Sequence, residues 1–483
     1  MTDVDQAISN NHRARPHVYP NQSRIAESEI ASNDRDIAHA TMIRDDNAPP
    51  AAPSFMQALA YWLWLGCISF GGPAGQIAIL HQDLVEKKRW ISERRFLHAL
   101  NYCMLLPGPE AQQLATYLGW LLHGKWGGFA AGALFVLPSL LLLIVLSWLY
   151  MVFGHTPAVA GLLYGIKPAI TAIVAFAAWR IGKRTLHSVW LGAISFAAFV
   201  AIFFLALPFP AIILGAALCG WLGGRLIPQH FAASRAQTEK NRSYGKALID
   251  DDTPMPEHAR FSLARFIRTL LIGFALWAGV LAALSFAFGT QSVLTQMGWF
   301  FTKAALLTFG GAYAVLPYVF QGAVSQFAWL NTGQMIDGLA LGESTPGPLI
   351  MVTTFVGFVG AWTHAPFGSD HLLAAGVAGA LVVTFFTFLP SFVFIFLGAP
   401  LIEKTHGQLH LAAPMNGITA AVVGVIASLA LFFAWHVYWP RGWQGALEWP
   451  ALIIGLCAFA VLWRWPTRVI PVIAASAVAG LLI

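Results

Sequence analysis

The tripeptide Pro107-Gly108-Pro109 interrupts an apolar stretch of this chain, and it returns 239 residues later as Pro346-Gly347-Pro348. An α-helix does not run through such a tripeptide, because proline has no N–H to donate and its ring clashes with the preceding turn. A second motif, Phe70-Gly71-Gly72, returns at the same spacing as Phe309-Gly310-Gly311. These matches predict that the chain contains two copies of one unit.

The similarity continues beyond these motifs. Leu137-Pro138-Ser139 matches Leu389-Pro390-Ser391, and Gly165-Ile166 matches Gly417-Ile418, both at a spacing of 252. The order of the motifs is the same in both copies. Ordered matches over this length are not expected by chance, so a duplication is predicted.

The duplication divides the 483 residues into five parts. The polar N-terminal part lacks the basic, apolar and small-residue regions of a cleavable signal, and its composition predicts disorder. In chain order we expect a disordered cytoplasmic tail (1–53), a first copy (54–224), a cytoplasmic linker (225–268), an additional transmembrane helix (269–289) and a second copy (290–483).

Composition places the chain in the membrane. It is 57% hydrophobic and only 10% charged, with a mean hydropathy of +0.65, whereas soluble domains carry about 25% charged residues. Apolar runs such as 127–152 and 269–289 reach the roughly 20 residues that cross a bilayer. The expected class is an all-α polytopic membrane protein, and the expected surroundings are a lipid bilayer.

Loop charges predict that the two copies have opposite orientations. Loop 81–95 contains five Lys or Arg residues, and its counterpart 320–334 contains none. Conversely, the turn at 207–210 is uncharged, and its counterpart carries Arg464 and Arg468. Basic loops face the cytoplasm, and the additional helix 269–289 supplies the crossing that inverts the second copy. Inverted repeats of this kind are typical of secondary transporters.

The same loops predict re-entrant hairpins. Loops 81–95 and 180–184 are both basic, so 96–122 is expected to return to the side that it left, and its arms beside the Pro-Gly-Pro tripeptide are too short to span. Segments 55–80 and 292–318 are assigned in the same way. The predicted count is nine full spans and four hairpins, with a cytoplasmic N-terminus.

The breaks are the predicted substrate site. A helix that starts after such a break directs free N–H groups and the positive end of its dipole into the membrane, and glycine lets a ligand approach the backbone. Four helix starts would form a donor-rich cup for a tetrahedral dianion. A kink that serves packing alone remains the alternative. The residues assigned to the cup are Gly71, Gly72, Pro73, Gln76, Pro107, Gly108, Pro109, Gly310, Gly311, Pro346, Gly347 and Pro348.

Two lysines lie inside apolar runs. Lys167 lies in the middle of a predicted span, and Lys303 lies in the arm that leads to the second Gly-Gly pair. A lysine at bilayer depth costs about 2.5–3.5 kcal/mol, so it usually faces a cavity or a partner. Both are assigned to the pathway, and snorkelling towards an interface remains the alternative, especially for Lys303.

Two carboxylates flank the Pro-Gly-Pro breaks. Glu110 follows the first break, and Glu343 precedes the second by three residues. A carboxylate beside a helix N-terminus caps it, worth under about 1 kcal/mol, whereas a carboxyl in an anion pathway can carry a proton. Capping is preferred for Glu110 and proton transfer for Glu343. The neutral Gln112 and Gln113 can donate to oxygens or face the surface.

Enzymatic chemistry is not expected. The sequence has neither a Walker-type loop nor histidines at metal-ligand spacing, and its cysteines form no CxxC pair. We therefore predict no catalytic residue, no metal and no cofactor. The net charge of +6 reflects loop Lys and Arg residues rather than nucleic-acid binding.

Through residues 70–73, Trp90, residues 107–110 and their second-copy counterparts, the chain resembles the chromate ion transporter family of the ChrA type, in its long, two-domain form. The resemblance implies chromate export from the bacterial cytoplasm through the inner membrane, driven by the membrane potential or the proton gradient, and hence chromate resistance. Short-chain relatives work as pairs of oppositely oriented proteins, and a homodimer is one option for this chain.

The second copy departs from the first at two positions: Ala312 replaces Pro73, and Leu349 replaces Glu110. The two sets of breaks therefore need not bind the anion equally well. Sulfate and chromate are near-isosteric dianions, so a carrier for sulfate or another anion remains an alternative. A membrane sensor or scaffold without transport is the alternative from a different class.

Overall fold

The computed structural model describes residues 49–70, 72–231, 244–254, 256–309, 311–402, 412–442, 445–466 and 468–483. Within these residues the chain is helical, and β structure is limited to one bridge between Ile91 and Ile249. The predicted all-α class is confirmed. Most of the predicted tail lies outside the described residues, as do Gly71 and Gly310 of the predicted site.

The first copy begins with short helices and continues with longer ones. Its elements are α2 (Phe55–Ile68), α3 (Gly72–His81), the π-helix η1 (Gln82–Lys87), α4 (Glu93–Cys103), α5 (Glu110–Phe153), α6 (Pro157–Thr185), α7 (Val189–Phe203) and α8 (Phe209–Leu226). The region between the copies contains α9 (Pro228–Phe231), the 3-10 turn η2 (Glu257–Ala259) and α10 (Leu263–Phe288).

The second copy follows the same order. Its elements are α11 (Val293–Leu307), α12 (Ala312–Phe320), the π-helix η3 (Gln321–Gln326), α13 (Thr332–Ser344), the 3-10 turn η4 (Leu349–Met351), α14 (Val352–His364), the 3-10 turn η5 (Ser369–His371), α15 (Leu372–Ile402), α16 (Ala412–Tyr438), α17 (Trp449–Arg464) and α18 (Val469–Leu481).

Backbone irregularities recur at the spacing of the sequence motifs. The π-helices η1 and η3 start 239 residues apart. Arg89 and Ala328, also 239 residues apart, both adopt a φ of +50°, which costs energy for a residue with a Cβ. Each is followed by a buried tryptophan, Trp90 or Trp329. The two copies therefore repeat even a strained turn.

Helix α5 contains a sharp turn where the sequence predicts the end of a hairpin arm. His123 and Gly124 have non-helical dihedral angles, with a φ of +64° at Gly124. The chain then folds back on itself, so that a Cβ added to Gly119 would lie 2.5 Å from the carbonyl oxygen of Gly127. Helices α14 and α15 of the second copy make the same close approach, between Gly357 and Gly379.

Six helices among the described residues are long and apolar enough to cross a membrane: α5, α6, α8, α10, α15 and α16. The other three predicted spans are α7, α17 and α18, with 15, 16 and 13 residues. At 1.5 Å per residue these are about 20–24 Å long, shorter than a ~30 Å hydrocarbon core. Helix α7 ends early because the turn before Pro208 contains Ala206 at a φ of +49°, and residues before proline disfavour helix.

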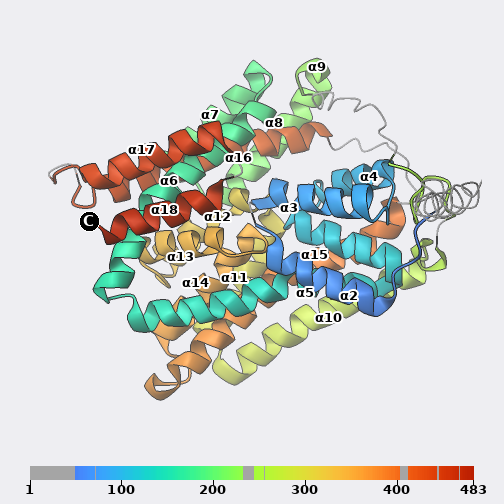
Figure 1. Ribbon diagram of the computed structural model, residues 1–483, viewed down its shortest axis with the longest axis horizontal. Helices are drawn as coiled ribbons and strands as arrows, with labels where there is room; N and C mark the ends of the chain where they lie inside the picture. Colours follow the sequence, from blue (N-terminus) through green and yellow to red (C-terminus); the bar gives the residue numbers. More distant parts are fainter. Residues whose placement is uncertain are drawn as a thin grey trace, which may run out of the picture. The chain divides into compact units, whose positions relative to one another are not determined.

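Helices of the two copies pack directly on each other. Helix α16 packs against α6, α7 and α8, and α6 also packs against α17 and α18. Small residues allow these close approaches, as at Gly424 beside Ser195 and Gly480 beside Gly161. Figure 1 shows the short helices α2, α3 and α4 towards one side of the bundle and α13 and α14 towards the other. The peripheral helix α10 is mostly exposed: only 6% of its apolar 18-residue stretch is buried.

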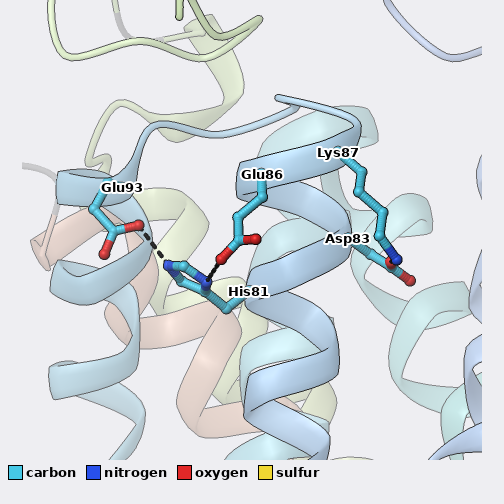
Figure 2. A network of polar contacts seen from close by, with 5 residues as sticks. All are labelled: His81, Asp83, Glu86, Lys87 and Glu93. Carbon is cyan, nitrogen blue, oxygen red and sulfur yellow. Dashed lines mark hydrogen bonds and ion pairs between the residues drawn. The ribbon is translucent and has the colours of Figure 1, made fainter. Parts of the chain in front are cut away.

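The region between the copies is attached to the first copy. Ile249 donates its N–H to the carbonyl oxygen of Trp90 at 3.1 Å and accepts from the N–H of Ser92 at 3.0 Å. Close by, His81 lies between Glu86 and Glu93, as Figure 2 shows. The predicted basic loop 81–95 therefore binds part of the linker through backbone hydrogen bonds.

Candidate functional site

All four predicted breaks interrupt helices: between α2 and α3, α4 and α5, α11 and α12, and α13 and η4. Each break has a glycine in the left-handed region, where a Cβ is disfavoured. The φ angles are +70° at Gly72, +132° at Gly108, +96° at Gly311 and +105° at Gly347. The glycines are thus required by the backbone at positions that correspond between the copies.

The helix starts differ from the prediction by one residue. Pro109 is the N-cap of α5, with an extended ψ of 105°, so the helix begins at Glu110. Pro348 likewise caps η4, with a ψ of 136°, and α14 follows this turn. A proline at the cap still leaves the first-turn N–H groups of the next residues without helical partners.

Breaks of different copies are joined by hydrogen bonds. Gly108 donates its N–H to the carbonyl oxygen of Thr308 at 2.7 Å, and Gly347 donates to that of Ser69, also at 2.7 Å. Ser69 and Thr308 are 239 residues apart, as are the two glycines. We call these contacts the first and second crossings. The same contact made twice with partners exchanged is what two copies related by a pseudo-two-fold axis produce.

A buried serine of the opposite copy lies at each crossing. A Cβ added to Gly108 would collide with Oγ of Ser391, and one added to Gly347 would lie 3.0 Å from Oγ of Ser139. Both serines are 0% exposed, and neither hydroxyl has a hydrogen-bond partner among the residues that the structure describes. An unpaired buried hydroxyl costs about 1–3 kcal/mol. These hydroxyls are therefore candidates for binding a ligand.

The glutamines lie inside the protein. Gln76, Gln112 and Gln113 are 1%, 0% and 0% exposed, so the surface alternative for Gln112 and Gln113 is wrong. Nε2 of Gln76 donates to the carbonyl oxygens of Gly347 at 2.5 Å and Ser69 at 3.2 Å, which ties it to the second crossing. Nε2 of Gln113 donates to the carbonyl oxygen of Pro107 at 2.8 Å.

Both candidate carboxylates contact the breaks. Oε1 of Glu110 lies 3.9 Å from the position of a Cβ on Gly311, a residue of the other copy. Glu343 is buried and accepts a hydrogen bond from the hydroxyl of Tyr313 at 2.6 Å. Tyr313 lies in α12, two residues after Gly311. The two carboxylates therefore approach the α11–α12 break from opposite copies.

The two lysines have different surroundings. Nζ of Lys167 lies 3.2 Å from Oδ1 of Asp337, and both residues line a cavity. Nζ of Lys303 lies over the ring of Trp299, 5.9 Å from its centroid, and Trp299 is 50% exposed. Sequence reasoning assigned both lysines to one pathway; the structure places Lys167 in the lining of a cavity and Lys303 against Trp299.

Sequence reasoning did not assign the serines at the crossings. Ser139 and Ser391 belong to the repeated Leu-Pro-Ser motif, which was a detectable signal. The motif was used only as a sign of duplication, because its spacing of 252 differs from the 239 of the breaks. Tyr313 was missed for another reason: only the fold places its hydroxyl beside Glu343.

Within the described residues, no group of three or more His, Cys, Asp or Glu side chains is placed to hold a metal ion. What the crossings do offer is neutral: hydroxyls, glycines without Cβ atoms and helix starts. Such groups donate hydrogen bonds to an anion without fixing a positive charge beside it.

Comparison with known proteins shows the family. The model of the family described as chromate transporter matches residues 56–221 and again 295–481. The chain is 32% identical to the chromate transport protein of Pseudomonas aeruginosa over 450 residues, which is 90% of this chain and 94% of that protein. It is 30% identical to the probable chromate transport protein of Synechococcus elongatus over 436 residues, 88% of this chain and 95% of that protein.

A shorter relative matches about a quarter of the chain. The uncharacterized transporter YwrB of Bacillus subtilis is 31% identical over 132 residues, which is 27% of this chain and 67% of that protein. No solved structure matches the chain. Two matches of one family model and relatives covered almost in full make this chain a multi-pass membrane protein of the chromate transporter family.

Proposed function

We propose that this chain exports chromate from the cytoplasm, and that the anion binds at the two crossings. The observation that carries the proposal is the pair of unpartnered serine hydroxyls, Ser139 and Ser391, each buried against a Pro-Gly-Pro glycine of the opposite copy. Buried hydroxyls without partners are unfavourable unless a ligand accepts hydrogen bonds from them. Chromate offers four oxygen atoms as acceptors.

The chemistry of the crossings suits a carried dianion. Helix starts and hydroxyls stabilise negative charge through oriented dipoles, and in a low-dielectric interior these interactions are stronger than in water. A fixed cation would hold a dianion tightly and slow its release. The glycines of the breaks, Gly72, Gly108, Gly311 and Gly347, contribute to this neutral lining, and Gln76 is bound to the second crossing.

The substrate assignment rests on the relatives, which are named as chromate transport proteins. Sulfate has the same charge and shape, so hydroxyl and N–H donors bind both. A sulfate carrier therefore remains the alternative. A sensor or scaffold, the alternative from a different class, predicts no anion movement at all.

The direction follows from charge. The membrane potential contributes about 2.3 kcal/mol per elementary charge per 100 mV. An inside-negative potential of about 100 mV therefore drives a dianion outwards with about 4.6 kcal/mol. We assign the chain to the bacterial inner membrane, with its N-terminus in the cytoplasm and its two copies inverted. Glu343, buried beside the α11–α12 break, is the candidate for coupled proton movement. A homodimer is compatible with this arrangement.

Everted membrane vesicles test the proposal. Vesicles that contain the chain are expected to accumulate labelled chromate, to lose this uptake on addition of an uncoupler, and to show whether excess sulfate competes. Lys167→Ala and Glu343→Gln are expected to abolish uptake while membrane insertion is retained. Absence of potential-dependent uptake would exclude a carrier, and complete competition by sulfate at equal concentration would favour the sulfate alternative.

A further inference from the structure

A cavity of about 190 Å³ lies where the end of α5, the first half of α6 and α13 meet. Its lining includes Tyr150, His155, Lys167, Gln334 and Asp337. One water molecule takes up about 30 Å³ of liquid, so the cavity has room for a tetrahedral oxyanion together with water. The polar side chains come from both copies, because α13 belongs to the second.

Within this cavity a carboxylate is held in the way that an oxyanion would be. Oδ1 of Asp337 lies 3.2 Å from Nζ of Lys167, and its Oδ2 accepts a hydrogen bond from the hydroxyl of Tyr150 at 3.0 Å. Both donors belong to the first copy. A cation and a neutral hydroxyl that bind two oxygens of one anion form a complete recognition element for such oxygens.

The ammonium of Lys167 has more N–H donors than its ion pair with Asp337 uses. It carries three N–H groups, and among the described residues one carboxylate oxygen is within ion-pair distance. The side chain of Lys167 is 31% exposed, whereas that of Asp337 is 6% exposed. Lys167 is therefore accessible where it lines the cavity, which Gln334 and His155 also line.

We propose that this cavity is a second oxyanion site, in which Lys167 binds the anion and Asp337 is a built-in competitor for the same ammonium. The inference rests on the proposed function, because it takes the transported anion as its ligand. When the cavity holds no anion, Asp337 neutralises Lys167, and a buried cation without a partner would be costly. When an anion binds, the carboxylate repels it and keeps the affinity low.

The place of the cavity in the fold fits a site of entry or release. Asp337 and the end of α13 at Ser344 are seven residues apart, about 10 Å along a helix, and the second Pro-Gly-Pro break follows. One turn before Lys167 on α6, the hydroxyl of Tyr164 donates a hydrogen bond to Oε2 of Glu448 at 3.2 Å. The cavity is thus separate from the crossings but lies on a helix that leads to them.

Direct binding of chromate tests this inference. The full-length chain in lipid nanodiscs is titrated with labelled chromate, and the number of sites and their dissociation constants are measured. We expect two classes of site. Asp337→Asn keeps a hydrogen-bonding group for Tyr150 but removes the competing charge, so it should tighten the weaker class by about tenfold or more. Lys167→Gln with Asp337→Asn should remove that class and retain the other.

The double variant guards against misfolding, because it removes both buried charges together rather than leaving one unpaired. The matched control is Lys87→Gln with Asp83→Asn, an ion pair of 3.0 Å outside this cavity that Figure 2 shows. It should leave both classes unchanged.

Four outcomes would count against the inference. Retention of both classes in the Lys167→Gln, Asp337→Asn variant overturns it, as does weaker binding in Asp337→Asn alone. A single class that is lost on substitution of Ser139 and Ser391 but not of Lys167 overturns this inference and leaves the proposed function intact. Absence of any chromate binding by the unmodified chain overturns both.

Discussion

Gly347 donates its N–H to the carbonyl oxygen of Ser69 at 2.7 Å, although the two residues belong to different copies. The hydrogen bond needs a glycine at its donor end for two reasons. The φ of Gly347 is +105°, and a Cβ would lie 2.7 Å from that of Ser139. Backbone conformation, packing and the candidate site thus depend on one missing side chain.

Gly347→Ala is expected to destabilise the protein and to abolish transport. Strain at a positive φ costs about 1–3 kcal/mol, and the Cβ must also displace Ser139. Thermal unfolding of the purified chain, together with chromate uptake, measures both effects. The matched control is Gly192→Ala in α7, where nothing lies within 4 Å of an added Cβ; it should be neutral or slightly stabilising. Equal stability of the two variants would contradict the role assigned to Gly347.

Ser139→Ala and Ser391→Ala are expected to separate stability from transport. Because neither hydroxyl has a described partner, its removal should leave the free energy of unfolding unchanged or raise it by about 1 kcal/mol. Loss of one hydrogen bond to a charged ligand is worth about 1.5–3 kcal/mol, so uptake at low chromate concentration should fall about 10- to 100-fold.

Ser147→Ala is the control for the serines. Ser147 is also 0% exposed and without a described partner, but it lies two turns beyond Ser139 on α5. Its substitution should leave uptake unchanged. If Ser147→Ala and Ser139→Ala reduce uptake equally, the hydroxyls at the crossings have no special role.

Glu343→Gln is expected to abolish transport with little loss of stability. The amide keeps an oxygen that accepts from the hydroxyl of Tyr313, which lies 2.6 Å from the carboxylate, but it cannot carry a proton. Tyr313→Phe should show the opposite pattern, with about 1–2 kcal/mol of lost stability and a smaller loss of uptake. Uptake by Glu343→Gln at the normal rate would exclude the carboxyl as a proton carrier.

Lys303→Gln is expected to retain transport. The ammonium of Lys303 lies over Trp299, whose indole is half exposed, and such a contact is worth about 0.5–1 kcal/mol. A small decrease in melting temperature with normal chromate uptake is the predicted result. Loss of uptake comparable to that of Lys167→Ala would return Lys303 to the pathway.

The breaks could be predicted from the sequence because their cause is local. Pro-Gly-Pro interrupts a helix through local geometry, the Gly-Gly pairs recur at the same spacing, and the structure has a break at each of these positions. The turn at Gly124 lies where segment 96–122 was predicted to end. The helix starts were displaced by one residue because Pro109 adopts an extended ψ and caps the helix from outside.

The contacts across the copies could not be predicted. Lys167 was noticeable as a charge in an apolar run, but its pairing with Asp337 depends on how α6 and α13 meet. The serines were visible as a repeated motif, yet only the fold reveals that their hydroxyls have no described partner. Similarly, the lengths of α7, α17 and α18 could not be predicted, because they depend on turns that a hydropathy profile does not reveal.

The exchange of hydrogen bonds between Gly108 and Thr308 and between Gly347 and Ser69 also bears on evolution. Each copy supplies an N–H whose acceptor lies in the other copy, so a single copy would leave that N–H unpaired in the bilayer, where this is most costly. Two separately encoded halves would complement each other at the same positions. Gene fusion would then have changed the covalent connection without altering the interface, and a substitution at one break would select for compensation in the other half.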